Sequence, residues 1–140
     1  MSGLLHQATC VAIDGRAVLI EGRPGSGKSS LALALIDRGS VLIGDDGVLI
    51  ERDGDRLLAS PAPATEGLLE VRNVGLLAFP TISRIPVALL IGLDPAAPRF
   101  RDAPAWLDRA GVRLPAISLW PDSPILALRA ELALRTYGLT

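Results

Sequence analysis

One stretch of this chain constrains the fold more than any other. Residues 22–29 have the sequence Gly-Arg-Pro-Gly-Ser-Gly-Lys-Ser and match G-x-x-x-x-G-K-[ST], the phosphate-binding loop pattern. The apolar residues 17–20 precede it and predict a buried strand, and residues 30–38 predict a helix that ends at Gly39. Strand, glycine-rich loop and helix in this order predict a P-loop; the alternative is a glycine-rich turn that happens to precede a helix.

The residue types in this stretch suit a phosphate chain. The glycines allow the backbone to bend so that its N–H groups surround an anion, and the following helix directs its positive end at the same point. Lys28 supplies a positive charge for the outer phosphates, and the Ser29 hydroxyl is a ligand for Mg²⁺. The predicted nucleotide contacts are Gly22, Arg23, Pro24, Gly25, Ser26, Gly27, Lys28, Ser29 and Ser30.

Composition limits the broad class of protein. The chain has 140 residues, 49% of them hydrophobic, which predicts one domain over residues 1–140 with an aliphatic core. The net charge of −1 gives no electrostatic reason to expect binding to nucleic acid or membranes. The single cysteine, Cys10, excludes an intrachain disulfide and is expected to fill the core. No signal peptide and no apolar run of ~20 residues is visible, so a soluble, cytoplasmic protein is expected.

Most of the remaining chain predicts strands. Asp14-Gly15 is a hairpin signal between residues 6–13 and 17–20. Other extended segments are expected at 41–43, 48–51 and 56–59 (an exposed hairpin), 68–77 (two pieces with a bend near Asn73), 86–93 and 114–119.

Helices are expected to be few. Residues 94–104 predict a mobile loop and residues 105–110 one or two helical turns. Ser123-Pro124 predicts the N-cap and first-turn proline of a final helix that runs to about Tyr137. The predicted class is therefore α/β, with a Walker A loop built on a mixed, largely β sheet, one helix after the loop and one at the C-terminus.

A second group of residues offers acid–base chemistry. Asp45 and Asp46 follow an apolar strand, where a carboxylate could hold a metal or activate a hydroxyl. A plain turn over residues 45–47 is the alternative. Asp94 also follows a strand and competes for the same role.

Further charged residues have two interpretations each. Glu70 and Arg72 are two apart in an extended stretch and lie on one face, where they could hold metal and phosphate or, more simply, form a salt bridge. Arg99, Arg101 and Arg109 lie in or near the mobile loop, which is either a phosphate-reaching segment or a solvated basic loop.

With these residues assembled, the chain resembles the catalytic domain of HPr kinase/phosphorylase, the bacterial enzyme acting on a serine of the phosphocarrier HPr. His6 leads the strand before the loop, and residues 22–29 are the loop itself. Residues 35–39 are similar to the family's helix end, and residues 42–46 follow at the family's spacing. Residues 69–77, Leu-Glu-Val-Arg-Asn-Val-Gly-Leu-Leu, are similar to the family signature L-E-I-R-G-L-G-I-I and are the most specific part of the match.

The resemblance implies roles for the matched residues. Lys28 and the loop amides hold the nucleotide phosphates, and Ser29 and Glu70 hold Mg²⁺. Asp46, supported by Asp45 and His6, takes the proton from the target serine.

Two arginines complete the implied site. Arg72 lies in the signature strand used in both directions of the reaction, and Arg101 is the counterpart of a family arginine in a flexible loop. The resemblance also implies ATP as donor, an HPr-like phosphocarrier as acceptor, a role in phosphotransferase-system or carbon/nitrogen regulation, and a hexameric homo-oligomer.

Some features depart from the family. The N-terminal domain of the long form is absent, so a short, catalytic-domain-only version is expected. Asn73 replaces the signature glycine, and residues 119–122 occupy the place of the later P-V-x-x-G-R motif, which is tied to dephosphorylation. A nucleotide-sensing module that transfers no phosphate therefore stays open as an alternative function, as does a small-molecule kinase.

Overall fold

Three parallel strands form the centre of the fold. The computed structural model describes residues 3–140, and in it β3 (Arg16–Glu21) and β11 (Val112–Leu119) each pair in parallel with β9 (Ile85–Leu93). Residues of β3 alternate between two core clusters, with Val18 and Ile20 on one face and Ala17 and Leu19 on the other. Burial on both faces explains why β3 and β9 contain continuous apolar runs rather than an alternation of apolar and polar residues.

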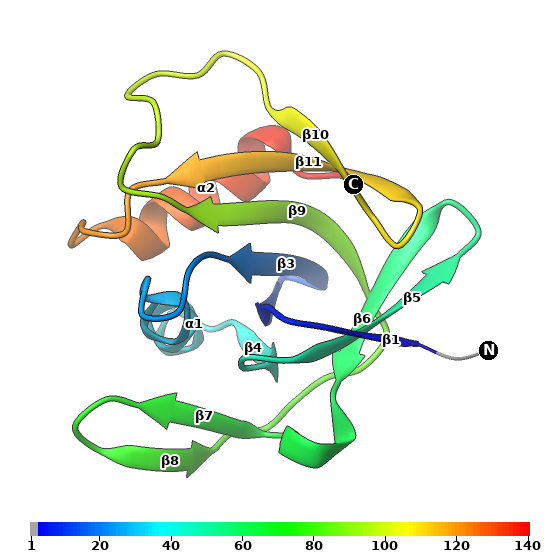
Figure 1. Cartoon of the computed structure of the whole chain (residues 1–140), viewed down its shortest axis with the longest axis vertical. Coiled ribbons are helices and arrows are strands. Elements are labelled where there is room, and N and C mark those ends of the chain that lie inside the picture. Colours follow the sequence, from blue (N-terminus) through cyan, green and yellow to red (C-terminus); the bar gives the residue numbers. More distant parts are fainter. Residues whose placement is uncertain (1–2) are drawn as a thin grey trace.

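Antiparallel strands extend this centre into a nine-stranded mixed sheet (Figure 1). On one side β2 (Thr9–Ile13) joins β3 to β4 (Val41–Gly44). On the other side the β5–β6 hairpin (Val48–Asp53 and Arg56–Pro61) joins β9 to β1 (Leu4–His6). β10 (Ala105–Arg109) pairs with β11. The described residues also contain a separate hairpin of β7 (Leu68–Val71) and β8 (Gly75–Ala78), preceded by a 3₁₀ turn, η1 (Pro63–Thr65).

Two helices cover one face of the sheet (Figure 1). Helix α1 (Lys28–Asp37) buries Leu31 and Leu35, and α2 (Leu126–Tyr137) buries Ala130 and Leu134, all in the same cluster. The second apolar cluster lies on the opposite face of the sheet. It contains residues of the three central strands and of the β5–β6 hairpin. The predicted mixed sheet with two helices is confirmed.

Four local expectations were wrong. Residues 105–110 are mainly a strand, because β10 pairs with β11 across a turn in which Ala110 and Gly111 both have positive φ. The strand expected at 6–13 is broken at residues 7–8, and its first part pairs with β5. The β5–β6 hairpin is largely buried on one face. Helix α2 begins at Leu126, with Ile125 as N-cap, so Ser123 forms a turn rather than the cap.

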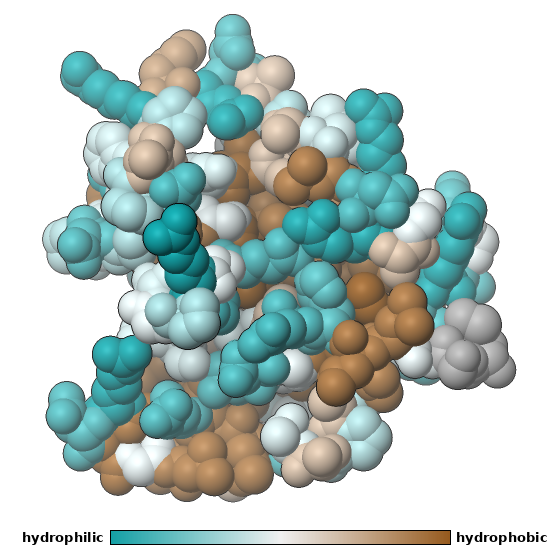
Figure 2. Space-filling model, in the orientation of Figure 1, coloured by the Kyte–Doolittle hydropathy of each residue, from teal (hydrophilic) through white to brown (hydrophobic). Residues whose placement is uncertain are grey.

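Apolar side chains also remain on the surface. Val74 and Leu76 are 67% and 64% exposed at the β7–β8 hairpin, and Leu5 of β1 is 72% exposed. Figure 2 shows apolar surface along the bottom of the molecule, where this hairpin lies. Among the helices of residues 3–140, none has the length and apolarity needed to cross a lipid bilayer. Cys10 is buried, and burial raises the pKa of its thiol, so it fills the core as expected.

Candidate active site

The glycine-rich loop connects β3 to α1 and has the backbone that its sequence predicts. Gly25 and Gly27 have φ of 78° and 105°, in the region that glycine adopts without strain. A Cβ atom on Gly22 would lie 2.5 Å from Ser26 Oγ and 3.3 Å from the Leu93 carbonyl oxygen, so only glycine fits there. The Ser26 hydroxyl is buried and has no hydrogen-bond partner within residues 3–140. Lys28 Nζ donates to the carbonyl oxygens of Gly22 and Arg23 at 3.0 and 3.2 Å.

The acidic pair after β4 faces the start of α1. Asp45 Oδ1 accepts hydrogen bonds from the hydroxyls of Ser29 at 2.6 Å and Thr9 at 3.2 Å. Asp45 Oδ2 accepts one from the backbone N–H of Glu70 at 3.2 Å. A single carboxylate therefore joins the loop helix, β2 and β7.

Asp46 differs from its neighbour. Its φ is 60°, which is uncommon for a non-glycine residue. The turn around it is tight, because a Cβ atom on Gly44 would collide with the carbonyl oxygen of Gly47. Asp46 is exposed, while Asp45 is half-buried. The turn interpretation and the functional interpretation of this segment are thus compatible.

A cavity of about 170 Å³ brings most of the predicted site residues together. Most of the lining residues carry a charge or a hydroxyl. They are Thr9, Lys28, Ser29, Ser30, Asp45, Asp46, Glu70 and Arg72, and the loop adds Pro24, Gly25 and Gly27. Glu70 and Arg72 do not form the expected salt bridge with each other in the described chain. The Arg72 guanidinium instead reaches the loop, where a Cβ on Gly25 would lie 3.8 Å from its Nη2.

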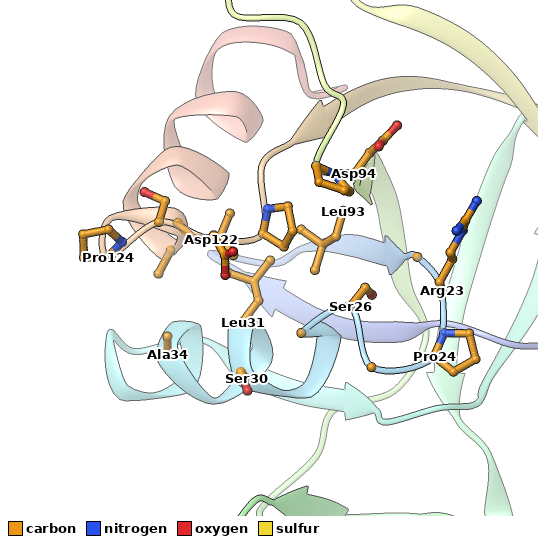
Figure 3. A pocket seen from close by; sticks show the side chains of 18 of the residues that line it. Arg23, Pro24, Ser26, Ser30, Leu31, Ala34, Leu93, Asp94, Asp122 and Pro124 are labelled. Carbon is orange, nitrogen blue, oxygen red and sulfur yellow. The ribbon is translucent and has the colours of Figure 1, made fainter.

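A larger groove of about 1080 Å³ lies on the other side of the loop (Figure 3). It opens where β3, β9 and β11 end, the usual place for ligands in open α/β sheets. Its walls are residues 22–27 of the loop, residues 93–96 at the end of β9 and just after it, and residues 121–124 before α2, together with residues of α1 and α2. Asp94 lies here, where its carboxylate accepts a hydrogen bond from the Ala96 N–H at 2.8 Å, and not beside Ser29. The structure thus separates Asp94 from the acidic pair.

His6 bonds to a carboxylate outside the acidic pair. Its Nε2 is 2.7 Å from Glu21 Oε2, and Arg109 donates to both oxygens of the same carboxylate at 2.7 and 3.0 Å. Burial alone would raise the pKa of Glu21, but the hydrogen bonds and charges of Arg109 and His6 outweigh it and lower that pKa. The hydrogen bond to Glu21 also raises the pKa of Arg109. His6 therefore binds the residue just before Gly22 rather than Asp45 or Asp46.

Arg101 also lies apart from the cavity. Its Nη1 donates to the Ala103 carbonyl, its own carbonyl accepts from Tyr137, and it lines neither cavity nor groove. Sequence reasoning missed Thr9 and the Glu21–Arg109 pair, because no motif marks them. The only available signals were that Thr9 is a polar residue in an apolar strand and that Arg109 belongs to the arginine-rich segment.

Comparison with known families decides the relationship. The model of the HPr serine kinase C-terminal domain matches residues 3–83, more than half of the chain, and this range contains the loop, the acidic pair, Glu70 and Arg72. The chain belongs to this HPr serine kinase C-terminal domain family.

Individual relatives support the same family. An HPr kinase/phosphorylase of an Exiguobacterium species is 39% identical over 92 residues, which are 60% of this chain and 30% of that protein. One of Mycoplasmopsis pulmonis is 42% identical over 69 residues, covering 49% of this chain and 22% of that protein. The chain thus spans less than a third of the length of these relatives.

A solved structure matches nearly the whole of this chain. The structure of the HPr(Ser) kinase/phosphatase from Coxiella burnetii superimposes on this chain with a TM-score of 0.84 at 28% identity. The match covers 95% of this chain and 89% of that one, so it includes the segments after residue 83, where the family model ends.

Proposed function

We propose that this chain is an ATP- and magnesium-dependent kinase that phosphorylates a serine of an HPr-type phosphocarrier protein. One observation carries the proposal: a single small cavity beside the glycine-rich loop is lined by residues from three segments of the chain, Lys28 and Ser29, Asp45 and Asp46, and Glu70 and Arg72. Phosphoryl transfer requires charge stabilisation, a hold on the metal and a group that orients the nucleophile, and this set supplies all three. The names of the relatives point to the acceptor.

The residues of the cavity fit a magnesium ion. Mg²⁺ prefers oxygen ligands, and Ser29, Asp45 and Glu70 offer a hydroxyl and two carboxylates around one space. The Ser29 hydroxyl donates a 2.6 Å hydrogen bond to Asp45, which follows a strand as the metal-binding aspartate of other P-loop proteins does. We therefore assign Asp45, together with Ser29, to the binding of the metal ion. When bound, the ion neutralises charge on the phosphate oxygens.

The cationic groups of the chain hold the phosphates. The N-terminus of α1 and the loop N–H groups suit an anion, and the buried Ser26 hydroxyl in the loop is free to bond to one. Lys28 exchanges its bonds to the Gly22 and Arg23 carbonyls for bonds to the outer phosphates. Arg72, on the opposite wall near Gly25, stabilises charge on the group being transferred.

Asp46 acts as the base. Its carboxylate is exposed, lines the cavity and has no hydrogen-bond partner within the described residues, so it is free to accept the proton of a serine hydroxyl. The serine oxygen then bonds to the γ-phosphorus, the bond from that phosphorus to the bridging oxygen breaks, and ADP leaves with the electron pair. In the reverse direction, an oxygen of inorganic phosphate bonds to the phosphorus of the phosphoserine and the bond from that phosphorus to the serine oxygen breaks. The serine oxygen takes the proton of a protonated Asp46, and pyrophosphate leaves.

The proposal is tested by labelling. The purified chain is incubated with γ-³²P-labelled ATP, Mg²⁺ and HPr-type proteins of the same organism, and then with added phosphate. We expect label on a partner serine, and we expect Asp46→Asn to lower the transfer rate at least about 100-fold while ATP affinity changes less than about threefold. Asp55→Asn, an exposed aspartate in the distant β5–β6 turn, is the matched control.

Two results would count against the proposal. ATP binding without label on any partner would favour the nucleotide-sensing alternative, and an unchanged rate in Asp46→Asn would remove Asp46 as the base. A homo-oligomer, a cytoplasmic location, a single domain over residues 1–140 and roles for His6 and Arg101 in catalysis remain predictions.

A further inference from the structure

A third cavity, of about 350 Å³, lies beside the large groove but does not belong to it. The groove is lined by residues 93–96 and 121–124, whereas this cavity is lined by residues 97–99 and 118–120 and by Arg129 of α2. Two hydrogen bonds join these segments, from the Asp94 N–H to the Leu119 carbonyl at 3.0 Å and from Trp120 Nε1 to the Ala97 carbonyl at 2.6 Å. The walls of the cavity are therefore fixed to each other.

The cavity is basic. Arg99 and Arg129 both line it, and neither belongs to any ion pair found in residues 3–140. Arg38, Arg84 and Arg109, by contrast, each bind a carboxylate at 2.7–2.8 Å. The described lining contains no acidic side chain, and the Ser118 hydroxyl adds a neutral donor. Two guanidinium groups at one cavity, neither paired with a carboxylate of the described residues, favour an anionic ligand.

The Arg129 side chain is held in position before any ligand binds. The Arg129 guanidinium lies over the Trp120 ring at 5.7 Å from its centroid, and the ring itself is held by its bond to Ala97. Stacking engages the face of the guanidinium and leaves the N–H groups at its edge free for an oxyanion. A ligand therefore meets a donor that needs little further ordering.

We propose that this cavity binds the phosphate group of a small phosphate monoester. Arg99 and Arg129 hold the phosphate oxygens with a contribution from Ser118, and the organic part of the molecule packs on Pro98, Leu119 and Trp120. The volume falls within the range of about 300–1,000 Å³ in which proteins bind small ligands. This site goes beyond the proposed kinase activity and does not depend on it.

The test uses the fluorescence of Trp120. The chain has two tryptophans, so Trp106→Phe leaves Trp120 as the only one, and its ring contacts the arginine that the ligand engages. The full chain carrying this substitution is titrated with glycerol 3-phosphate, with inorganic phosphate and with sodium chloride at equal ionic strength. We expect a saturable change with glycerol 3-phosphate, weaker binding of inorganic phosphate, and no saturation with chloride.

Variants separate this cavity from the glycine-rich loop. Arg99→Gln and Arg129→Gln should each weaken glycerol 3-phosphate binding at least about tenfold, because each removes a charged hydrogen-bond donor. Arg135→Gln, on an exposed part of the same helix, and Lys28→Ala, which removes the loop cation, should leave that binding unchanged. Since Arg129→Gln also alters the environment of Trp120, the rise in melting temperature caused by the ligand is measured in parallel.

Each result has a defined meaning. Loss of binding in Lys28→Ala, retention of it in both Arg99→Gln and Arg129→Gln, or no saturable response at all would overturn the proposed site. Inorganic phosphate binding as tightly as glycerol 3-phosphate would support the anion site but overturn the monoester as its ligand.

Discussion

The ion pair between Glu21 and Arg109 allows a stability prediction whose size follows from its geometry. Glu21 immediately precedes the glycine-rich loop, and Arg109 ends β10, so the pair joins two segments 88 residues apart. Arg109→Gln removes both charged hydrogen bonds and leaves the Glu21 carboxylate, only 20% exposed, with His6 as its partner.

The expected cost is about 2 kcal/mol of unfolding free energy. Breaking a fully buried pair costs about 3–5 kcal/mol, and a fully exposed pair contributes about 0–1 kcal/mol. The Arg109 and Glu21 side chains are 25% and 20% exposed, between these limits. For a chain of this length, the loss corresponds to a fall in melting temperature of about 7 °C.

Urea unfolding followed by circular dichroism measures the change. The matched control is Arg84→Gln, because Arg84 binds Glu51 at 2.8 Å but is 62% exposed, so its loss should cost less than about 1 kcal/mol. Equal losses in the two variants, or a loss below about 0.5 kcal/mol in Arg109→Gln, would refute the argument that burial sets the strength of this pair.

The same pair should give a pH dependence of known sign. Because the folded-state pKa of Glu21 is lowered, its contribution is fully present above its ordinary pKa of about 4.3 and is lost as the pH falls through the lower folded value. The loss of unfolding free energy caused by Arg109→Gln should therefore be greatest near neutral pH. It should become smaller as the pH falls below the ordinary pKa of Glu21. A cost that stays constant down to the acid transition would contradict the assignment to Glu21.

Two further predictions concern the loop. Ser29→Ala should raise the Mg²⁺ concentration needed for phosphotransfer about 10–100-fold, because it removes one oxygen ligand and the 2.6 Å bond to Asp45; an unchanged Mg²⁺ titration would exclude Ser29 from the metal site. Gly22→Ala should weaken ATP binding at least about tenfold, since its Cβ would displace Ser26 and the loop, while circular dichroism shows the fold retained; calorimetric ATP affinity equal to wild type would contradict this.

Several elements were predictable from the sequence for clear physical reasons. The loop and the helix after it follow from local glycine positions and apolar periodicity, and Asp14-Gly15 specifies its hairpin because both residues adopt positive φ. The central strand at residues 85–93 could be predicted because a strand buried on both faces must be apolar throughout.

Other elements depended on partners that are distant in the sequence. Residues 105–109 contain good helix formers, yet they form a strand because β11 offers an edge and Ala110-Gly111 turns the chain back onto it. The exposure of the β5–β6 hairpin was predicted wrongly because its packing against β1 and β9 joins residues from three parts of the chain.

The sequence by itself determined that this chain carries a glycine-rich loop between a strand and a helix, an acidic pair at a strand end and a largely β fold, since each of these depends on residues close together in the chain. Only the tertiary structure decided which carboxylate meets which donor. Asp45 bonds to Ser29, Thr9 and Glu70, while His6 bonds to Glu21, which also binds Arg109. Such pairings depend on strand order and register, and those are fixed by burying two apolar clusters on opposite faces of one sheet.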